Sequence, residues 1–191
     1  KLNLTKEPFI AKASIDINMK GKSIDEAIGK LKLKDIVLRD QNKDQALLIE
    51  NLDVQVEQVG IDKKLIVDSE FGKIAAEGKF VLSDLLKDIK GILKSNIPSL
   101  PFEENQNVNH IDLSYTIRFA NSRKLLTYLN IPVKSDLAIF EGKLNSDQKL
   151  LTVNSNVTDF EYQGIKIKNF KLLSEWNNTA ISSKLYADKV N

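Results

Sequence analysis

The chain has few of the residue types on which many catalytic and metal sites depend. Its 191 residues include no cysteine, one histidine, eight glycines and four prolines. Without cysteine there are no disulfides, no thiolate metal ligands and no thiol nucleophile. The glycines form neither of the glycine-rich motifs that bind phosphates or dinucleotides, and the acidic residues lack calcium-loop spacing. We therefore expect no metal ion and no cofactor, while the compartment stays open.

Long apolar runs and blocks of one charge are also missing. No run of about 18 apolar residues occurs, so we expect no helix that spans a bilayer. Lysine and arginine number 28 against 26 aspartates and glutamates, and the two signs alternate along the chain. This pattern gives no reason to expect nucleic-acid binding. The overall usage, 42% apolar and 28% charged, is typical of a folded domain.

Alternation of apolar and polar residues is the main signal in the sequence. Between residues 9 and 19 the apolar positions are Phe9, Ala11, Ala13, Ile15, Ile17 and Met19. Successive side chains of a strand point to opposite faces, so this spacing predicts a half-buried strand. The same alternation returns in roughly a dozen short segments separated by turn-like pieces. We expect a mainly β fold, an elongated antiparallel sheet with one long apolar face.

Helical spacing appears three times, so two or three short helices are expected beside the sheet. Ser23 and Glu26 have the spacing of a capping box. Ser83 and Asp84 precede an amphipathic segment whose apolar face is Leu85, Leu86, Ile89, Ile92 and Leu93. Asn121 or Ser122 opens a shorter segment with Leu125, Leu126 and Leu129. Two prolines follow the second helix, and the polar residues 103–109 predict a mobile loop.

A weak internal repeat organises the chain. Residues 35–38 resemble 159–162, and residues 50–54 resemble 168–172. We divide the chain into a first repeat-like segment (1–96), a loop (97–109) and a second, incomplete segment (110–191). Repetition of this kind indicates a sheet that grows by addition of strands. We expect the 191 residues to be an internal stretch of a longer protein.

One set of residues invites a catalytic interpretation. His110, Asp112 and Ser114 alternate along one predicted strand face. Neighbours on such a face stand about 6.6 to 6.8 Å apart and point in parallel, whereas a nucleophile and its base must meet at about 2.6 to 3.2 Å. We expect a solvated strand surface, no catalytic residues and no enzyme. Trp176 and Tyr162 could stack on a sugar, but a core position is the commoner role of such aromatics.

The apolar face can be closed or open. A second sheet would close it into a β-sandwich, such as a binding module. Alternatively, a curved open sheet would form a half-pipe, or β-taco, with an apolar groove. Small residues such as Ala13, Ala76 and Gly78 among the large ones leave room for a groove. The residues expected to line it are Ile15, Ile17, Val54, Val56, Val67, Phe80, Leu113, Tyr115, Ile117, Ile139 and Phe170.

Several segments resemble the TamB family, part of the AsmA-like group of bridge-type lipid transport proteins. They resemble most the versions from Bacteroidetes-type bacteria. The resemblance covers residues 10 to 95 best and is carried by residues 17–25 (INMKGKSID), 29–35 (GKLKLKD), 49–54 (IENLDV), 65–69 (LIVDS), 74–80 (IAAEGKF) and 85–89 (LLKDI). The family has no catalytic residues to transfer.

The resemblance implies a location, a ligand and a partner. Proteins of this family are anchored in the inner membrane of Gram-negative bacteria and cross the periplasm as bent sheets with an apolar interior. They are implicated in moving phospholipid to the outer membrane, and TamB-type members pair with an Omp85-type outer-membrane barrel. The expected ligands are therefore phospholipid acyl chains. A second hypothesis is a scaffold for outer-membrane protein assembly, in which exposed strand edges pair with an unfolded client.

Overall fold

The computed structural model describes residues 9–40, 45–96, 110–130, 133–135, 137–162, 164–177 and 179–190. The predicted loop at 103–109 lies outside these residues. The described elements include one 3-10 helix, η1 (Ile24–Glu26), and two α-helices, α1 (Leu85–Asn96) and α2 (Arg123–Tyr128). The strands are β1 (Phe9–Lys20), β2 (Ile28–Asp40), β3 (Leu47–Val59), β4 (Asp62–Ser69), β5 (Gly72–Lys79), β6 (Asp112–Ala120), β7 (Val133–Ser135), β8 (Leu137–Asn145), β9 (Leu150–Tyr162), β10 (Ile165–Trp176), β11 (Ile181–Tyr186) and β12 (Lys189–Val190).

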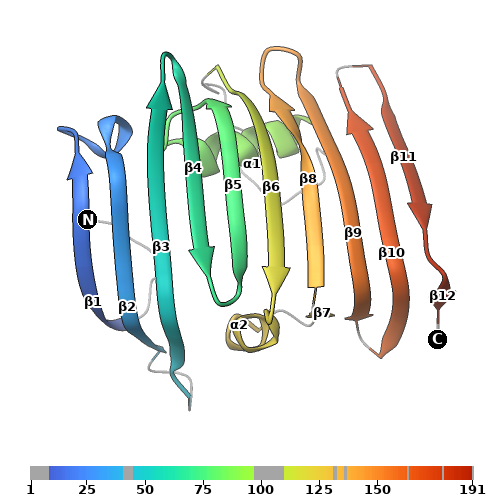
Figure 1. Cartoon of the computed structure of the whole chain (residues 1–191). Helices are drawn as coiled ribbons and strands as arrows, with labels where there is room; N and C mark the ends of the chain where they lie inside the picture. Colours follow the sequence, from blue (N-terminus) through green and yellow to red (C-terminus); the bar gives the residue numbers. More distant parts are fainter. Residues whose placement is uncertain are drawn as a thin grey trace.

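All the described strands belong to one open antiparallel sheet (Figure 1). Ten of them follow the order β1-β2-β3-β4-β5-β6-β8-β9-β10-β11, while the short β7 and β12 pair with β9 and β10. This confirms the prediction of a mainly β chain with a long antiparallel sheet and two short α-helices. Within the described residues no second sheet faces the first, so the closed sandwich is not the architecture found here.

Helix α1 lies in the connection between β5 and β6 and crosses the sheet on one side (Figure 1). Its residue Ile92 is 3% exposed and joins a cluster of buried side chains from the sheet. Leu85 and Ile89 pack against the same cluster, which confirms the predicted apolar face of the helix at these positions. The other buried residues of the cluster lie in the strands or directly beside them, and they are Ala76, Phe80, Ile111, Leu113, Leu144 and Leu151.

The predicted capping box at Ser23 is wrong. The segment forms only the three-residue η1, and Ser23 makes no side-chain cap. The Glu26 carboxylate instead accepts a hydrogen bond from the backbone N–H of Lys22 at 3.1 Å. Asp25 in η1 accepts bonds from the backbone N–H and the hydroxyl of Ser83, at 2.8 and 2.9 Å. These bonds from Ser83 hold the pKa of the Asp25 carboxyl below its ordinary value and tie η1 to the entry of α1.

Two non-glycine residues with left-handed backbone conformation lie inside described strands, Asp35 in β2 (φ 51°) and Asn169 in β10 (φ 50°). Aspartate and asparagine tolerate this conformation better than most residues. The consequence is visible beside Asn169, where the rings of Phe160 and Phe170 stack with centroids 6.2 Å apart. Phe170 pairs with Val157, three residues before Phe160. Regular alternation would place Val157 and Phe160 on opposite faces, so the alternation shifts by one residue here.

Candidate functional site

One row of side chains crosses the whole sheet at a single register. Directly paired residues of an antiparallel sheet lie on the same face, so the strand pairings can be followed from β1 to β11. Nine of the ten positions in this row are apolar. The central row, as we call it, consists of Ile17, Leu31, Val54, Val67, Ile74, Ile117, Phe140, Ser155, Leu172 and Leu185. The hydroxyl of the one exception, Ser155, is buried and accepts the backbone N–H of Leu172 at 3.2 Å.

The neighbouring register points to the other face and is polar. Its members are Asp16, Lys32, Asp53, Asp68, Lys73, Arg118, Ile139, Asn156, Lys171 and Tyr186. Asp68 and Lys73 form an ion pair at 3.3 Å. The sheet therefore has an apolar face and a solvated face, as the alternation predicts.

The two α-helices cover the apolar face on either side of the central row. On one side α1 packs over residues that include Leu113, Leu144 and Leu151, which are 3 to 5% exposed. On the other side lie Ala138 and Val157, also buried, which share an apolar cavity with Leu126 of α2. Near the middle of the sheet, the central row thus lies between two covered regions.

Helix α2 is fastened at both ends by hydrogen bonds from side-chain hydroxyls. The buried Ser122 hydroxyl donates to the carbonyl oxygen of Ser135 in β7 at 3.1 Å. The Tyr128 hydroxyl donates to the carbonyl of Leu38 at 3.2 Å and accepts the N–H of Asp40 at 3.1 Å. These bonds connect α2 to β2 as well as to β7, so the helix is tied to strands on both sides of β6.

The central row stays accessible, most of all at the two edges of the sheet. Ile17 in β1 is 64% exposed and Leu185 in β11 is 63% exposed. Ile74 near the middle is 38% exposed, and Val54, Val67, Ile117, Phe140 and Leu172 are half-buried. Monomeric proteins seldom leave a contiguous apolar surface of this kind uncovered. The strip is therefore the best candidate for a binding surface.

The structure brings most of the predicted lining residues together. Four of them lie in the central row (Ile17, Val54, Val67 and Ile117), and five lie on the same face in the flanking rows (Ile15, Val56, Leu113, Tyr115 and Phe170). Phe80 follows β5 and is buried in the cluster beneath α1. Their shared face is observed, and their contact with lipid stays a prediction.

Ile139 is a correction, because it lies on the solvated face. It pairs with Arg118 and Asn156, while its neighbour Phe140 belongs to the central row. The four residues 137–140 (LAIF) are all apolar, so alternation cannot assign a face there. The pairing partners decide the face, and they are not visible in the sequence of this segment alone.

Other members of the strip were not among the predicted lining residues. Leu31, Ile74 and Leu172 lie at regularly alternating apolar positions of their strands. The alternation could therefore have identified them as lining residues. Phe140 lies in the ambiguous run, and Leu185 lies in β11, where residues 181–186 (ISSKLY) show little alternation. Only the pairing of Leu185 with Leu172 places it on this face.

The structure gives His110 and Ser114 partners outside the set formed by His110, Asp112 and Ser114. His110 precedes β6, and its Nδ1 lies 2.6 Å from a carboxylate oxygen of Asp147 at the surface. Asp112 is paired with Lys79 and Asn145 in the sheet. Ser114 donates to the carbonyl of Glu77 at 3.4 Å. His110 and Ser114 thus have partners other than those that a triad requires.

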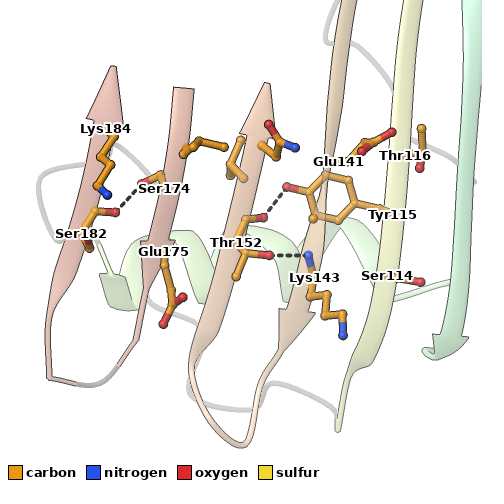
Figure 2. Close-up of a pocket in the computed structure, with 14 residues that line it drawn as sticks. Ser114, Tyr115, Thr116, Glu141, Lys143, Thr152, Ser174, Glu175, Ser182 and Lys184 are labelled. Atoms are coloured by element: carbon orange, nitrogen blue, oxygen red, sulfur yellow. Dashed lines mark hydrogen bonds between the residues drawn. The ribbon is translucent and has the colours of Figure 1, made fainter. Parts of the chain in front are cut away.

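The solvated face carries an open depression of about 800 Å³ over β6, β8, β9, β10 and β11. Figure 2 shows that its polar side chains are spread over neighbouring strands, and that the hydroxyl of Tyr115 points toward Thr152. Ser114 and Ser174 both donate to backbone carbonyls. These groups serve the sheet and do not converge on one point, in contrast to the apolar strip.

Tyr115 lies on the apolar face and packs against the buried cluster, and its hydroxyl bonds to β9 where the β8–β9 ladder opens. Pairing stops after Glu141 and resumes at Leu144. The carbonyl of Thr152 accepts the Tyr115 hydroxyl at 2.9 Å, and the Thr152 hydroxyl accepts the N–H of Lys143 at 2.8 Å (Figure 2). A Cβ at Gly142 would collide with the Thr152 carbonyl, so glycine is required there. Burial raises the pKa of the Tyr115 hydroxyl.

Among the residues that the structure describes, no cluster of three or more histidine, cysteine, aspartate or glutamate side chains could hold a metal ion. No helix in the same part of the chain is long and apolar enough to cross a membrane. Comparison with protein-family models, with curated proteins and with solved structures finds no match for this chain.

Proposed function

We propose that this chain is a stretch of a TamB/AsmA-like protein that shields and conducts phospholipid acyl chains between the inner and outer membranes. The parent protein would be anchored in the inner membrane, cross the periplasm of a Gram-negative bacterium and work with an Omp85-type barrel. The sheet would curve into a half-pipe with the apolar face inside. No residue would act as a catalyst.

The observation that carries this proposal is the central row. Its ten positions cross ten strands, and nine spacings of about 4.8 Å make a strip roughly 43 Å long. That length exceeds the hydrocarbon core of a bilayer, about 30 Å. An acyl chain of ordinary length could therefore lie within the strip and still have apolar surface ahead of it.

The energetics favour a continuous apolar strip over a single tight pocket. Each CH₂ group left in water costs about 0.8 kcal/mol, so a phospholipid with about 30 such groups would cost on the order of 20 kcal/mol to carry unshielded. A uniform row of Ile, Leu, Val and Phe removes much of this cost at every position. Because no position binds much more tightly than the next, the chain could slide.

The helices fit this role as walls. Both lie on the apolar face, and they cover part of the registers on either side of the central row. A lipid tail on the strip would be flanked by α1 on one side and α2 on the other. The solvated face would stay in contact with the periplasm.

The first experiment is native mass spectrometry with lipid extraction on the purified chain. We expect phospholipid to copurify, and to be lost when Ile117→Asp or Val54→Asp places a charge in the central row. Thr116→Asp and Gln55→Asp are the matched controls, since these residues neighbour the same positions in sequence but face the opposite side. They should keep the lipid. A wild-type chain that stays monomeric and lipid-free would contradict the proposal.

The free sheet edges favour a second candidate, the scaffold for outer-membrane protein assembly. Within the described residues, β1 pairs only with β2, and its twelve residues leave one long edge unpaired. Such an edge can add a strand from a client protein. Ile117→Asp separates the two candidates, because it would block lipid binding and leave the β1 edge intact.

A further inference from the structure

A cavity of about 340 Å³ lies between α2 and the apolar face. Its buried floor includes Ala138 and Val157, which are 5 and 4% exposed. The larger apolar side chains around it are half-buried, so each of them is partly in contact with solvent. They are Phe119, Leu126, Val133, Phe140, Phe160 and Phe170. The cavity is therefore a pocket with a buried floor and an accessible rim.

The pocket offers a ligand almost nothing to which a polar group could bond. Of the described residues that line it, only Ser122 and Ser135 are polar. The Ser122 hydroxyl donates to the carbonyl of Ser135 at 3.1 Å, and the Ser135 hydroxyl donates to the carbonyl of Leu137 at 3.4 Å. A buried water needs about two to four polar partners. The pocket therefore favours hydrocarbon over water.

The charged side chains of the adjoining strands belong to the other face of the sheet. Lys134 in β7 and Lys166 in β10 both pair with Glu161 in β9. Glu161 directly follows Phe160, which lines the pocket, so these three charges point to the solvated face. There Lys134 bonds to Glu161 at 2.6 Å and lowers the pKa of its carboxyl. The pocket thus has no means of recognising a charged head group.

The size and position of the pocket indicate which hydrocarbon fits it. A cavity of about 150 Å³ takes a benzene molecule, so 340 Å³ has room for roughly ten to twelve carbons. That is one alkyl chain and not the two chains of a phospholipid. Phe140 lines the pocket and also belongs to the central row, where it pairs with Ile117. A chain on the central row can therefore turn its end into the pocket beside Phe140.

We propose that the pocket beneath α2 binds the end of a single uncharged alkyl chain, to a length of roughly ten to twelve carbons. The head of the molecule stays outside. This inference rests on the proposed affinity of the apolar face for acyl chains. It adds a side site that holds one chain more firmly than the central row does, and that selects by chain length and not by head group.

Calorimetric titration of the purified chain with hexanol, octanol and decanol tests the pocket. We expect one tightly bound molecule per chain, and an affinity that rises roughly fourfold with each added CH₂ group, because each is fully removed from water. Octyl glucoside, below its micelle concentration, should bind like octanol. A gain below about twofold per CH₂ group would indicate adsorption to an open surface and overturn the proposal.

One pair of variants locates the site. Ala138→Leu fills the floor of the pocket and should weaken decanol binding roughly tenfold or more. Ala75→Leu makes the same change on the solvated face and should leave decanol binding unchanged. Undiminished decanol binding by Ala138→Leu, with its fold verified by circular dichroism, would show that the ligand lies elsewhere.

A second pair of variants tests the pocket without filling it. Leu126→Ala enlarges the pocket from the side of α2, so the affinity for dodecanol should rise relative to that for decanol. Leu129→Ala, at a 51% exposed position directly after α2, is its control and should keep the wild-type ratio. The same ratio in Leu126→Ala as in wild type would contradict a pocket that measures chain length.

This proposal and the proposed conduit fail separately. The pocket is built from β6, α2 and β7 to β10, so Val54→Asp in β3 leaves its walls intact. If phospholipid copurifies and is lost in Val54→Asp, but decanol does not bind, only the pocket is wrong. If decanol binds and responds to Ala138→Leu, but no phospholipid is found, the conduit is wrong and the pocket is a site of its own.

Discussion

The part of the apolar face beneath α1 and its edge at β1 differ in how far they are covered, not in sequence pattern. Leu144 and Leu151 are 3 and 5% exposed beneath α1, whereas Ile15 and Ile17 at the β1 edge are 62 and 64% exposed. Both regions alternate apolar and polar residues. The comparison shows that alternation specifies a face, while the connections that carry α1 and α2 decide which part of that face is buried.

This difference predicts separate roles for the two regions. The side chains buried beneath α1 stabilise the fold by removing apolar surface from water. The more exposed central row and sheet edges contribute less to stability and remain accessible to a ligand. Substitutions in the two regions should therefore separate stability from binding.

The largest expected effect comes from shortening a leucine in each region. Leu144→Ala removes a side chain that is 3% exposed, and Leu185→Ala removes one that is 63% exposed on the same face. We expect the first to lower the free energy of unfolding by about 2–5 kcal/mol and the second by less than about 0.5 kcal/mol. Urea unfolding measures both. Equal losses would mean that the edge is covered in solution.

A smaller effect is expected from Tyr115→Phe, which removes one hydrogen bond inside the covered region. The Thr152 carbonyl loses the hydroxyl that it accepts at 2.9 Å. We expect a loss of about 0.5–1.5 kcal/mol, measured by urea unfolding. Tyr186→Phe, at an exposed position in β11, is the control and should be neutral.

Tyr115→Phe should also change how the stability of the chain depends on pH in alkaline solution. Because burial raises the pKa of Tyr115 in the folded chain, its contribution is complete below the unfolded value of about 10 and is lost as pH rises above it. Between pH 9 and 11 the wild-type chain should therefore lose more stability than Tyr115→Phe. A variant that loses as much as wild type would show that Tyr115 is not the titrating group.

The smallest effect concerns the contact between the bare and covered regions. Asp25, in the turn between β1 and β2, accepts two hydrogen bonds from Ser83 at the entry to α1. Its lowered pKa means that this contribution is present above about 4 and is lost as pH falls through the lower folded value. In unfolding experiments from pH 5 to 2, Asp25→Asn should remove part of the acid sensitivity. Asp16→Asn, an exposed carboxylate in β1, should leave it unchanged.

Most of the sheet could be predicted from the sequence, because a strand with one buried face has to alternate. The segment from Phe9 to Met19 and the segment from Ile111 to Phe119 show this clearly, and both strands form where expected. The amphipathic spacing after Ser83 likewise predicted α1 and its contact through Ile89 and Ile92. In these cases a local pattern and a global contact depend on the same residues.

The features that could not be predicted from the sequence depend mostly on residues that are distant along the chain. The face of Ile139 is set by its pairing partners Arg118 and Asn156. The capping box predicted at Ser23 does not form, and Asp25 instead bonds to Ser83, which is distant in sequence. The shift at Asn169 depends on a backbone conformation that few residues adopt. The cavity beneath α2 joins residues from six separate elements, and no motif of the sequence marks it.

The order of the strands also bears on how the chain reaches this structure. From β1 to β5, and again from β8 to β11, each strand pairs with the next strand in the chain. Such contacts have low sequence separation, which speeds folding because little loop entropy is lost at each step. Hairpins could add one at a time to a growing edge. A chain built in this way could gain or lose a hairpin in evolution and keep the same cross-section, so that its reach is set by the number of strands.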